Sequence, residues 1–228
     1  SRKFRKIWSS DEFKTYVLLI GILTFIVTAT VYSTSAIPLE QAFRDSAFQI
    51  VSLITTTGFI SADYTAWTPA LTLLFFVLLF VGACAGSTSG GIKIIRHLVF
   101  FKNSFLEFKR LLHPRALVRT KIDKQLVAPR VLTHILVFLL IYLILFVVGS
   151  FRMAIIVADF QQPFLTAISS VATALGNVGP GIGDVGPTDN FSAIPASGKC
   201  FLAFLMLLGR LELFTILILF MPYFWRLN

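Results

Sequence analysis

The sequence predicts an all-α membrane protein made of two tandem repeats, each with a long helix, a short re-entrant helix, a glycine loop and a second long helix. Composition is the first observation behind this prediction. Of 228 residues, 56% are hydrophobic and only 14% are charged, and the mean hydropathy is +0.83. Because about a quarter of the residues in a typical soluble protein are charged, this composition excludes a water-soluble globule and predicts a multi-pass protein in a lipid bilayer.

The distribution of charge is the second observation. The net charge is +9, and most basic residues lie either before residue 15 or between Lys93 and Arg130. Acidic residues outnumber basic ones in the segments 40–63 and 152–199. Because cationic loops are poorly translocated, the sequence predicts that both termini and the middle loop are cytoplasmic. Membrane topology thus accounts for the positive charge, and no nucleic-acid partner is expected.

An internal repeat is the third observation. The same order of elements occurs twice, at an interval of 121 residues, which predicts a duplicated unit in parallel orientation. Identity between the two halves is weak, so the order of elements supports the duplication more than individual residues do. The corresponding residues are Gly58 and Gly179, Asp63 and Asp184, and Phe43 and Phe164.

The elements of the first repeat follow from its apolar stretches. Residues 15–37 are long enough to cross a bilayer core and end before Pro38. The segment 39–54 is apolar but too short to span, which is typical of a re-entrant helix. The second long stretch, 68–101, is interrupted by GACAGSTSGG at 82–91. We call residues 82–91 the interrupting loop.

The second repeat has corresponding elements. They are a long stretch at 131–151, a short apolar segment at 160–175, and a long stretch at 194–225 that Arg210 and Glu212 interrupt with charge. The predicted segments are therefore a cytoplasmic N-terminal segment (1–14), a first repeat (15–101), a cytoplasmic amphipathic linker (102–128) and a second repeat (129–228).

The linker is predicted to hold an amphipathic helix that breaks at Pro114. Phe105, Phe108, Leu111 and Leu112 recur at helical spacing on one face. A helix of this kind lies at the lipid headgroups or docks a cytosolic regulator.

Two glycine loops follow the short segments: the first glycine loop is ITTTGFIS (54–61), and the second is LGNVGPGIGD (175–184). Rings of backbone carbonyls replace the hydration shell of potassium in a selectivity filter, and glycine adopts the backbone angles that such rings need. A short helix also directs the partial negative charge of its C-terminal end toward the cation. The duplicated loops therefore predict a cation filter; alone, each could be a polar turn capping a buried helix. The candidate filter residues are Thr56, Thr57, Gly58, Asn177, Val178 and Gly179.

The interrupting loop is the candidate gate. Its glycines, alanines and hydroxyl residues do not hold a regular helix well, so a mobile segment is expected across the conduction path, with Lys93 at the cytoplasmic exit. The alternative is a close-packing interface, where small residues let helices touch. The candidate gating residues are Ala85, Gly86, Ser87, Thr88, Ser89, Gly90 and Gly91.

Three charged residues complete the candidate site. Arg210 lies deep in the last apolar stretch, and an intramembrane charge usually faces a cavity or a partner. It is expected to shape the ion pathway or to tether the interrupting loop; a structural ion pair is the alternative. Asp63 and Asp184 are expected to concentrate cations at the outer mouth.

Four specific motifs lie between residues 55 and 215: TTTGF at 55–59, AGSTSGGIK at 85–93, GNVGPG at 176–181 and LLGRLELFT at 207–215. Together they resemble the Trk/Ktr/HKT superfamily of potassium transporters, and most of all its bacterial Trk branch. The resemblance implies four repeats around a pseudo-fourfold pore, of which this chain carries the third and fourth. It also implies that carbonyls of residues 56–58 and 177–179 bind potassium, that residues 85–91 form an intramembrane gating loop, and that Arg210 lies beneath the filter.

The resemblance further implies partners. These are the missing N-terminal half of the same pore, a second copy in a homodimer, the lipid bilayer, and a cytosolic nucleotide-binding regulatory ring. Potassium is the transported ion, and no covalently bound cofactor is expected. Because the two glycine loops are unequal and only one long stretch carries the interruption, a fragment of a four-repeat protein is expected rather than an assembly of two copies.

Potassium uptake across the bacterial inner membrane is therefore the expected function. A carrier that couples potassium to sodium or protons would need a titratable residue or second ion site inside the spans, and only Arg210, Glu212 and His134 are candidates. A membrane enzyme would show paired carboxylates, histidine clusters or a nucleophile with its base. None of these appears in the sequence, so no enzyme is expected. A non-conducting scaffold would not need duplicated glycine turns.

Overall fold

The computed structural model describes residues 8, 10–113, 119–123, 125–211, 213–219 and 225. The basic residues before Trp8, the predicted break at Pro114, and Glu212 lie outside the described residues. The helices are α2 (Asp11–Thr34), α3 (Leu39–Ile54), α4 (Pro69–Leu78), α5 (Ile94–Leu112), α6 (Pro129–Ile156), α7 (Pro163–Gly176), α8 (Ala196–Arg210) and α9 (Leu213–Leu219). The smaller elements are an antiparallel hairpin, β1 (Lys121–Ile122) and β2 (Gln125–Leu126), and two 3-10 helices, η1 (Gly183–Val185) and η2 (Phe191–Ala193).

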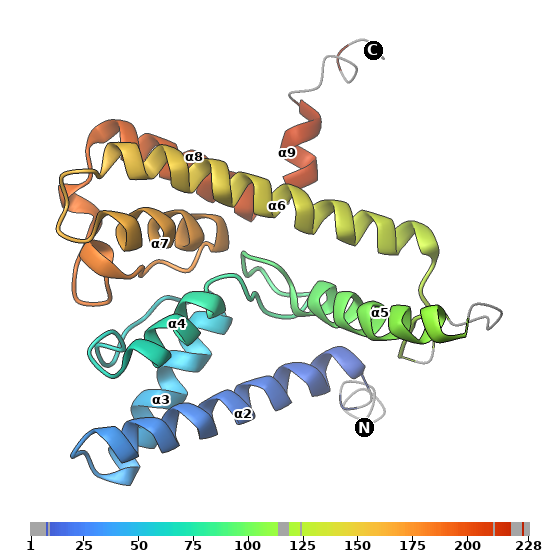
Figure 1. Cartoon of the computed structure of the whole chain (residues 1–228), viewed down its shortest axis with the longest axis horizontal. Coiled ribbons are helices and arrows are strands. Elements are labelled where there is room, and N and C mark those ends of the chain that lie inside the picture. The colour runs from blue at the N-terminus through green and yellow to red at the C-terminus, as the bar shows by residue number, and fades with distance from the viewer. Residues whose placement is uncertain are drawn as a thin grey trace.

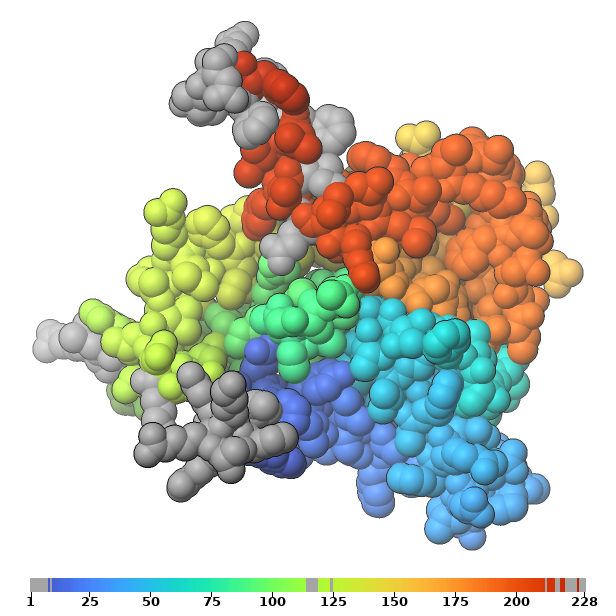
Figure 2. Space-filling model, turned by 180° about the vertical axis from the view of Figure 1, so that it is seen from behind, coloured from blue at the N-terminus to red at the C-terminus, as the bar shows by residue number. Residues whose placement is uncertain are grey.

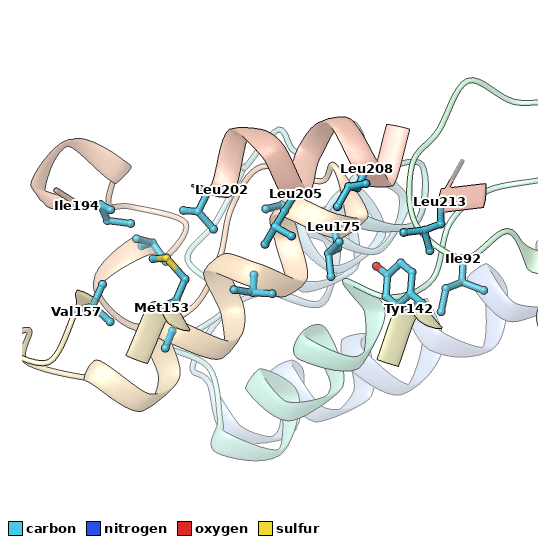
Figure 3. Close-up of a cluster of buried hydrophobic side chains, with 14 of the residues drawn as sticks. Ile92, Tyr142, Met153, Val157, Leu175, Ile194, Leu202, Leu205, Leu208 and Leu213 are labelled. Atoms are coloured by element: carbon cyan, nitrogen blue, oxygen red, sulfur yellow. The ribbon is translucent and has the colours of Figure 1, made fainter. Parts of the chain in front are cut away.

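The helices form two groups, one in each predicted repeat (Figure 1). In the first group α3 packs against α2, and in the second α7 packs against both α6 and α8. Each group has a hydrophobic cluster. In the second group, Met153 of α6, Leu175 of α7 and Leu205 of α8 are fully buried in this cluster (Figure 3). The short helices α3 and α7 are thus held by the longer helices around them.

The two groups meet beside the glycine loops. Ala172, Val178 and Ile182 come from the second repeat but lie in the cluster of the first, whereas Ile92 of the first repeat lies in the cluster of the second. Seen from behind, the green segment around the start of α5 lies between the blue-to-cyan and orange-to-red groups (Figure 2). The seam between the repeats therefore carries both glycine loops and the base of the interrupting loop.

Two of the four predicted long helices are continuous. Within the described residues, α2 and α6 are long and apolar enough to cross a bilayer, judged by length and composition. The other two are broken: α4 ends at Leu78 and helix resumes only at Ile94, while α8 ends at Arg210 and α9 begins at Leu213. The first break extends beyond the interrupting loop because the residues on either side of it pair with each other instead of continuing a helix.

The predicted boundary between the first repeat and the linker, at residues 101 and 102, falls inside a helix. α5 passes through it as a single helix from Ile94 to Leu112, since the sequence has no glycine or proline between Gly91 and Pro114. Lys102 of α5 forms an ion pair with Asp11 of α2 at 2.9 Å. The apolar face predicted for the linker, Phe105, Phe108, Leu111 and Leu112, is exposed on the second half of α5.

Candidate functional site

The two glycine loops have the same unusual backbone. Thr56 and Gly58 of the first loop have positive φ angles of 55° and 75°, and Asn177 and Gly179 of the second have φ angles of 52° and 122°. Residues 56 and 177, like residues 58 and 179, are related by the interval of 121 residues. A left-handed threonine is uncommon because its Cβ crowds the backbone. The surrounding structure therefore imposes one backbone pattern on two loops of different sequence.

The two loops also touch each other. A Cβ atom placed on Gly58 would lie 2.0 Å from the carbonyl oxygen of Val178, and one placed on Gly179 would lie 3.8 Å from the Cα atom of Gly58. No other residue type fits at position 58 without displacing the second loop. Gly58, Val178 and Gly179 thus meet at the seam between the repeats, just beyond the C-terminal ends of α3 and α7.

Buried hydroxyl groups of α7 hold the second glycine loop. Thr166 Oγ1 donates to the carboxylate of Asp184 at 2.8 Å and accepts from its backbone N–H at 3.0 Å. Ser169 Oγ donates to the carbonyl of Ile182 at 2.7 Å and accepts from its N–H at 3.0 Å. Thr173 Oγ1 accepts from the N–H of Gly179 at 2.9 Å. One face of α7 therefore fixes the loop along its whole length.

Polar side chains of α3 do the same for the first glycine loop. Ser52 Oγ donates to the carbonyl of Phe59 at 2.7 Å, and Gln49 Nε2 donates to the carbonyl of Ala62 at 2.8 Å. These supporting residues were not predicted from the sequence. The signal that could have found them is the helical spacing of the polar residues in each short segment: Gln49 and Ser52 in one, and Thr166, Ser169 and Thr173 in the other.

The two acids of the predicted outer mouth have structural partners. Asp63 Oδ1 accepts from the backbone N–H of Thr65 at 2.9 Å and from its hydroxyl. Asp184 Oδ2 accepts from the N–H of Gln162 at 2.9 Å as well as from Thr166. Both residues are half-buried. Their hydrogen bonds stabilise the backbone next to each glycine loop. The attraction of cations by Asp63 and Asp184 stays a prediction.

The interrupting loop contacts both glycine loops. The N–H of Gly90 donates to Thr56 Oγ1 at 3.3 Å. A Cβ atom on Gly90 would lie 2.4 Å from the carbonyl oxygen of Gly176 and 2.8 Å from the Cβ atom of Asn177. Close packing through a small residue, which the sequence analysis kept as an alternative, therefore occurs at Gly90. Gly90 thereby lies against Thr56 and Asn177, the first candidate filter residues of the two repeats.

Three groups hold the interrupting loop in this position. Its base closes through hydrogen bonds from the N–H of Gly82 to the carbonyl of Ile92 and from the N–H of Ile92 to the carbonyl of Phe80. Lys93 Nζ donates to the carbonyl of Ala85 at 3.2 Å and to that of Ser87 at 2.6 Å. Glu12, in the first turn of α2, accepts from the N–H of Ala85 at 2.6 Å. Glu12 was missed because it lies 73 residues away in the sequence.

Arg210 is the last residue of α8 and is exposed. A cavity of about 150 Å³ is lined by Arg210 and by residues of the loop and of its base. The other lining residues are Ser87, Thr88, Ser89, Gly91, Lys93, Arg96, Phe138 and Gly209. Arg210 therefore lies where it can contact the loop, as one of its two predicted roles requires. Glu212 lies outside the described residues, and the structural ion pair stays an alternative prediction for Arg210.

Comparisons with known proteins find relatives of this chain. The TrkH family, described as "Cation transport protein", matches residues 11–226. The Trk system potassium uptake protein TrkH of Escherichia coli K12 is 38% identical over 99% of the chain, and TrkG of the same organism is 34% identical over 99%. A crystal structure of the potassium transporter TrkH from Vibrio parahaemolyticus superimposes with a TM-score of 0.86 over 96% of the chain, at 35% identity.

These relatives are longer than this chain. The chain covers 46% of each of the two Escherichia coli proteins and 46% of the Vibrio structure. It therefore spans about half the length of the relatives that it matches, and the four motifs of the sequence analysis all fall within the matched half.

Proposed function

Since the chain is a membrane protein of the TrkH family of cation transport proteins, we propose that it conducts potassium through a filter formed by its two glycine loops. The observation that supports this most is that the two loops are adjacent and have positive φ angles at equivalent positions, 56 and 58 in one and 177 and 179 in the other. Carbonyls of Thr56, Thr57, Gly58, Asn177, Val178 and Gly179 bind the dehydrated ion. The membrane potential drives uptake, at about 2.3 kcal/mol per charge per 100 mV.

The interrupting loop is the gate of this pathway. Its contacts with Thr56 and Asn177 support a position directly below the filter. Hydrogen bonds from Lys93 and to Glu12 hold it there, and Arg210 reaches the same cavity from the other repeat. Movement of residues 85–91 away from this position opens the path to the cytoplasm. Asp63 and Asp184 lie on the outer side, where their charge favours cations.

The chain supplies two of the four sides of the pore. Its match to about half of each relative supports this division. The other two sides come from an N-terminal half with its own two repeats, and the complete pore works in the bacterial inner membrane as a homodimer. Both termini and residues 102–128 lie on the cytoplasmic side, where a nucleotide-binding ring controls the gate.

Ion flux into liposomes that hold the full-length protein tests the filter. Gly58→Ser adds a Cβ atom that collides with the carbonyl of Val178, whereas Gly179→Ser adds mainly backbone strain at its φ of 122°. Gly21→Ser is the matched control, because a Cβ on Gly21 of α2 meets no atom within 4 Å. We expect both filter variants to lower the potassium-to-sodium flux ratio by about tenfold, which corresponds to a change of about 1.4 kcal/mol in the free-energy difference between the two ions.

An unchanged ratio in both filter variants, with protein assembly retained, would reduce the two loops to structural turns. Flux that requires sodium or a proton gradient would instead favour the coupled carrier. Assembly is checked by size-exclusion chromatography of each variant before reconstitution.

A further inference from the structure

A buried tyrosine joins the two repeats just outside the proposed filter. The hydroxyl of Tyr64, in the segment between α3 and α4, donates to the backbone carbonyl of Gly181 at 2.8 Å. Tyr64 is only 1% exposed, and the hydrogen bond is buried. The two residues are 117 positions apart in the sequence, so this contact exists only in the folded pair of repeats.

Both ends of this bond are held in place. The ring of Tyr64 packs on Phe75 of α4, with ring centroids 4.7 Å apart, and Phe75 packs in turn on Trp67 at 5.8 Å. At the other end, the N–H of Gly181 donates to the carbonyl of Val185 at 2.8 Å. A Cβ atom on Gly181 would lie 2.7 Å from the side chain of Val185. A hydrogen bond between two fixed groups sets a distance between the elements that carry them.

The bond is not duplicated by the internal repeat. Val185, which lies 121 residues after Tyr64, occupies the equivalent position in the second repeat, and its side chain has no donor. The hydroxyl bond therefore fixes the seam between these two repeats specifically. Gly181 is two residues from Gly179, and Gly58 touches Val178 across the same seam, so the bond lies next to the point where the two loops meet.

We propose that Tyr64 is a positioning residue that sets the spacing between the two filter loops and thereby the selectivity among monovalent cations. This inference rests on the proposed filter. Coordination of a dehydrated cation depends on the number and arrangement of the carbonyls around it. Loss of the hydroxyl leaves the buried carbonyl of Gly181 without this partner, and the second loop is then free to shift relative to the first. Sodium, which is smaller than potassium, is discriminated less well when that spacing relaxes.

Tyr64→Phe removes the hydroxyl and keeps the ring that packs on Phe75. Tyr142→Phe is the matched control, because Tyr142 is also a buried tyrosine, in α6, and its hydroxyl has no hydrogen-bond partner among the described residues. Potassium, rubidium and sodium fluxes are measured in liposomes that hold the full-length protein. We expect Tyr64→Phe to lower the potassium-to-sodium ratio by about three- to tenfold, the range that one buried hydrogen bond supplies, and Tyr142→Phe to leave it unchanged.

A further variant with p-aminophenylalanine at position 64 restores a hydrogen-bond donor on the same ring. We expect it to recover most of the wild-type potassium-to-sodium flux ratio. The ratio separates selectivity from stability, because a smaller folded fraction lowers all fluxes equally. A wild-type ratio in Tyr64→Phe overturns the inference while leaving the proposed filter intact. Loss of assembly in Tyr64→Phe also overturns it, because the bond would then stabilise the fold as a whole. Absence of selective potassium flux in the wild type would instead refute the filter itself.

Discussion

At the scale of single residues, the proposed filter depends on side chains that do not face the ion. Thr166, Ser169 and Thr173 of α7 are almost completely buried, and each bonds a different part of the second glycine loop. These bonds fix the backbone of a loop in which Asn177 and Gly179 have positive φ angles of 52° and 122°. The residues that shape selectivity are therefore expected to extend beyond those that bind the cation.

Thr173→Val tests this support with almost no change in volume. The substitution removes the acceptor of the Gly179 N–H, so a donor beside the filter loses its partner. A buried unpaired group costs about 1–3 kcal/mol, and we expect a lower thermal unfolding temperature together with a reduced potassium-to-sodium flux ratio. Thr30→Val is the control, because the hydroxyl of Thr30 makes an exposed hydrogen bond within α2, and it should change neither quantity. A drop in unfolding temperature with a normal flux ratio would limit Thr173 to a structural role.

At the scale of elements, the sequence predicted the short helices better than the long ones. α3 covers the predicted segment 39–54, because Pro38 precedes it and its apolar residues end at the first glycine loop. The extent of α5 was missed because the apolar stretch and the amphipathic linker were treated as separate units. The bonds made by Tyr64 and Glu12 could not be predicted, since they join residues 117 and 73 positions apart that meet only in the folded structure.

The interrupting loop is the element on which gating is proposed to depend, and Gly90→Ala tests its position. The added methyl group would lie 2.4 Å from the carbonyl oxygen of Gly176, so the loop has to move away from the second glycine loop. We expect potassium flux to rise without a regulator. Gly86→Ala is the control, because a Cβ on Gly86 meets no atom within 4 Å. Equal flux in Gly90→Ala and the wild type would show that the loop does not limit conduction.

The bond between Glu12 and the loop makes a second prediction at this scale. Glu12→Ala removes the acceptor of the Ala85 N–H, whereas Glu12→Gln keeps an oxygen in the same place. If the bond holds the loop closed, Glu12→Ala raises potassium flux by up to about tenfold, the effect of one typical hydrogen bond, and Glu12→Gln stays near the wild type. An identical rise in both variants would point to the charge rather than to the bond. A normal flux in Glu12→Ala would exclude a role for Glu12 in closure.

At the scale of the whole molecule, the proposed orientation in the membrane follows from the charge distribution. It predicts that two exposed positions, one in η2 and one in α5, face opposite sides of the membrane. Ser192 of η2 and Lys109 of α5 are both exposed, and the positive-inside rule assigns them to opposite sides. Cys84 and Cys200 are both free cysteines, so the test uses Ser192→Cys and Lys109→Cys in a background where both are replaced by serine. A membrane-impermeant thiol reagent is added to intact cells and to inside-out vesicles.

We expect the cysteine at position 192 to react in intact cells and the cysteine at position 109 to react only in inside-out vesicles. This pattern would place the filter near the outer side and the base of the interrupting loop near the cytoplasm, so that a cation entering from outside meets the glycine loops before the gate. The reverse pattern would make the interrupting loop an outer gate. The basic residues between Lys93 and Arg130 would then lie outside, against the charge asymmetry from which the orientation was inferred.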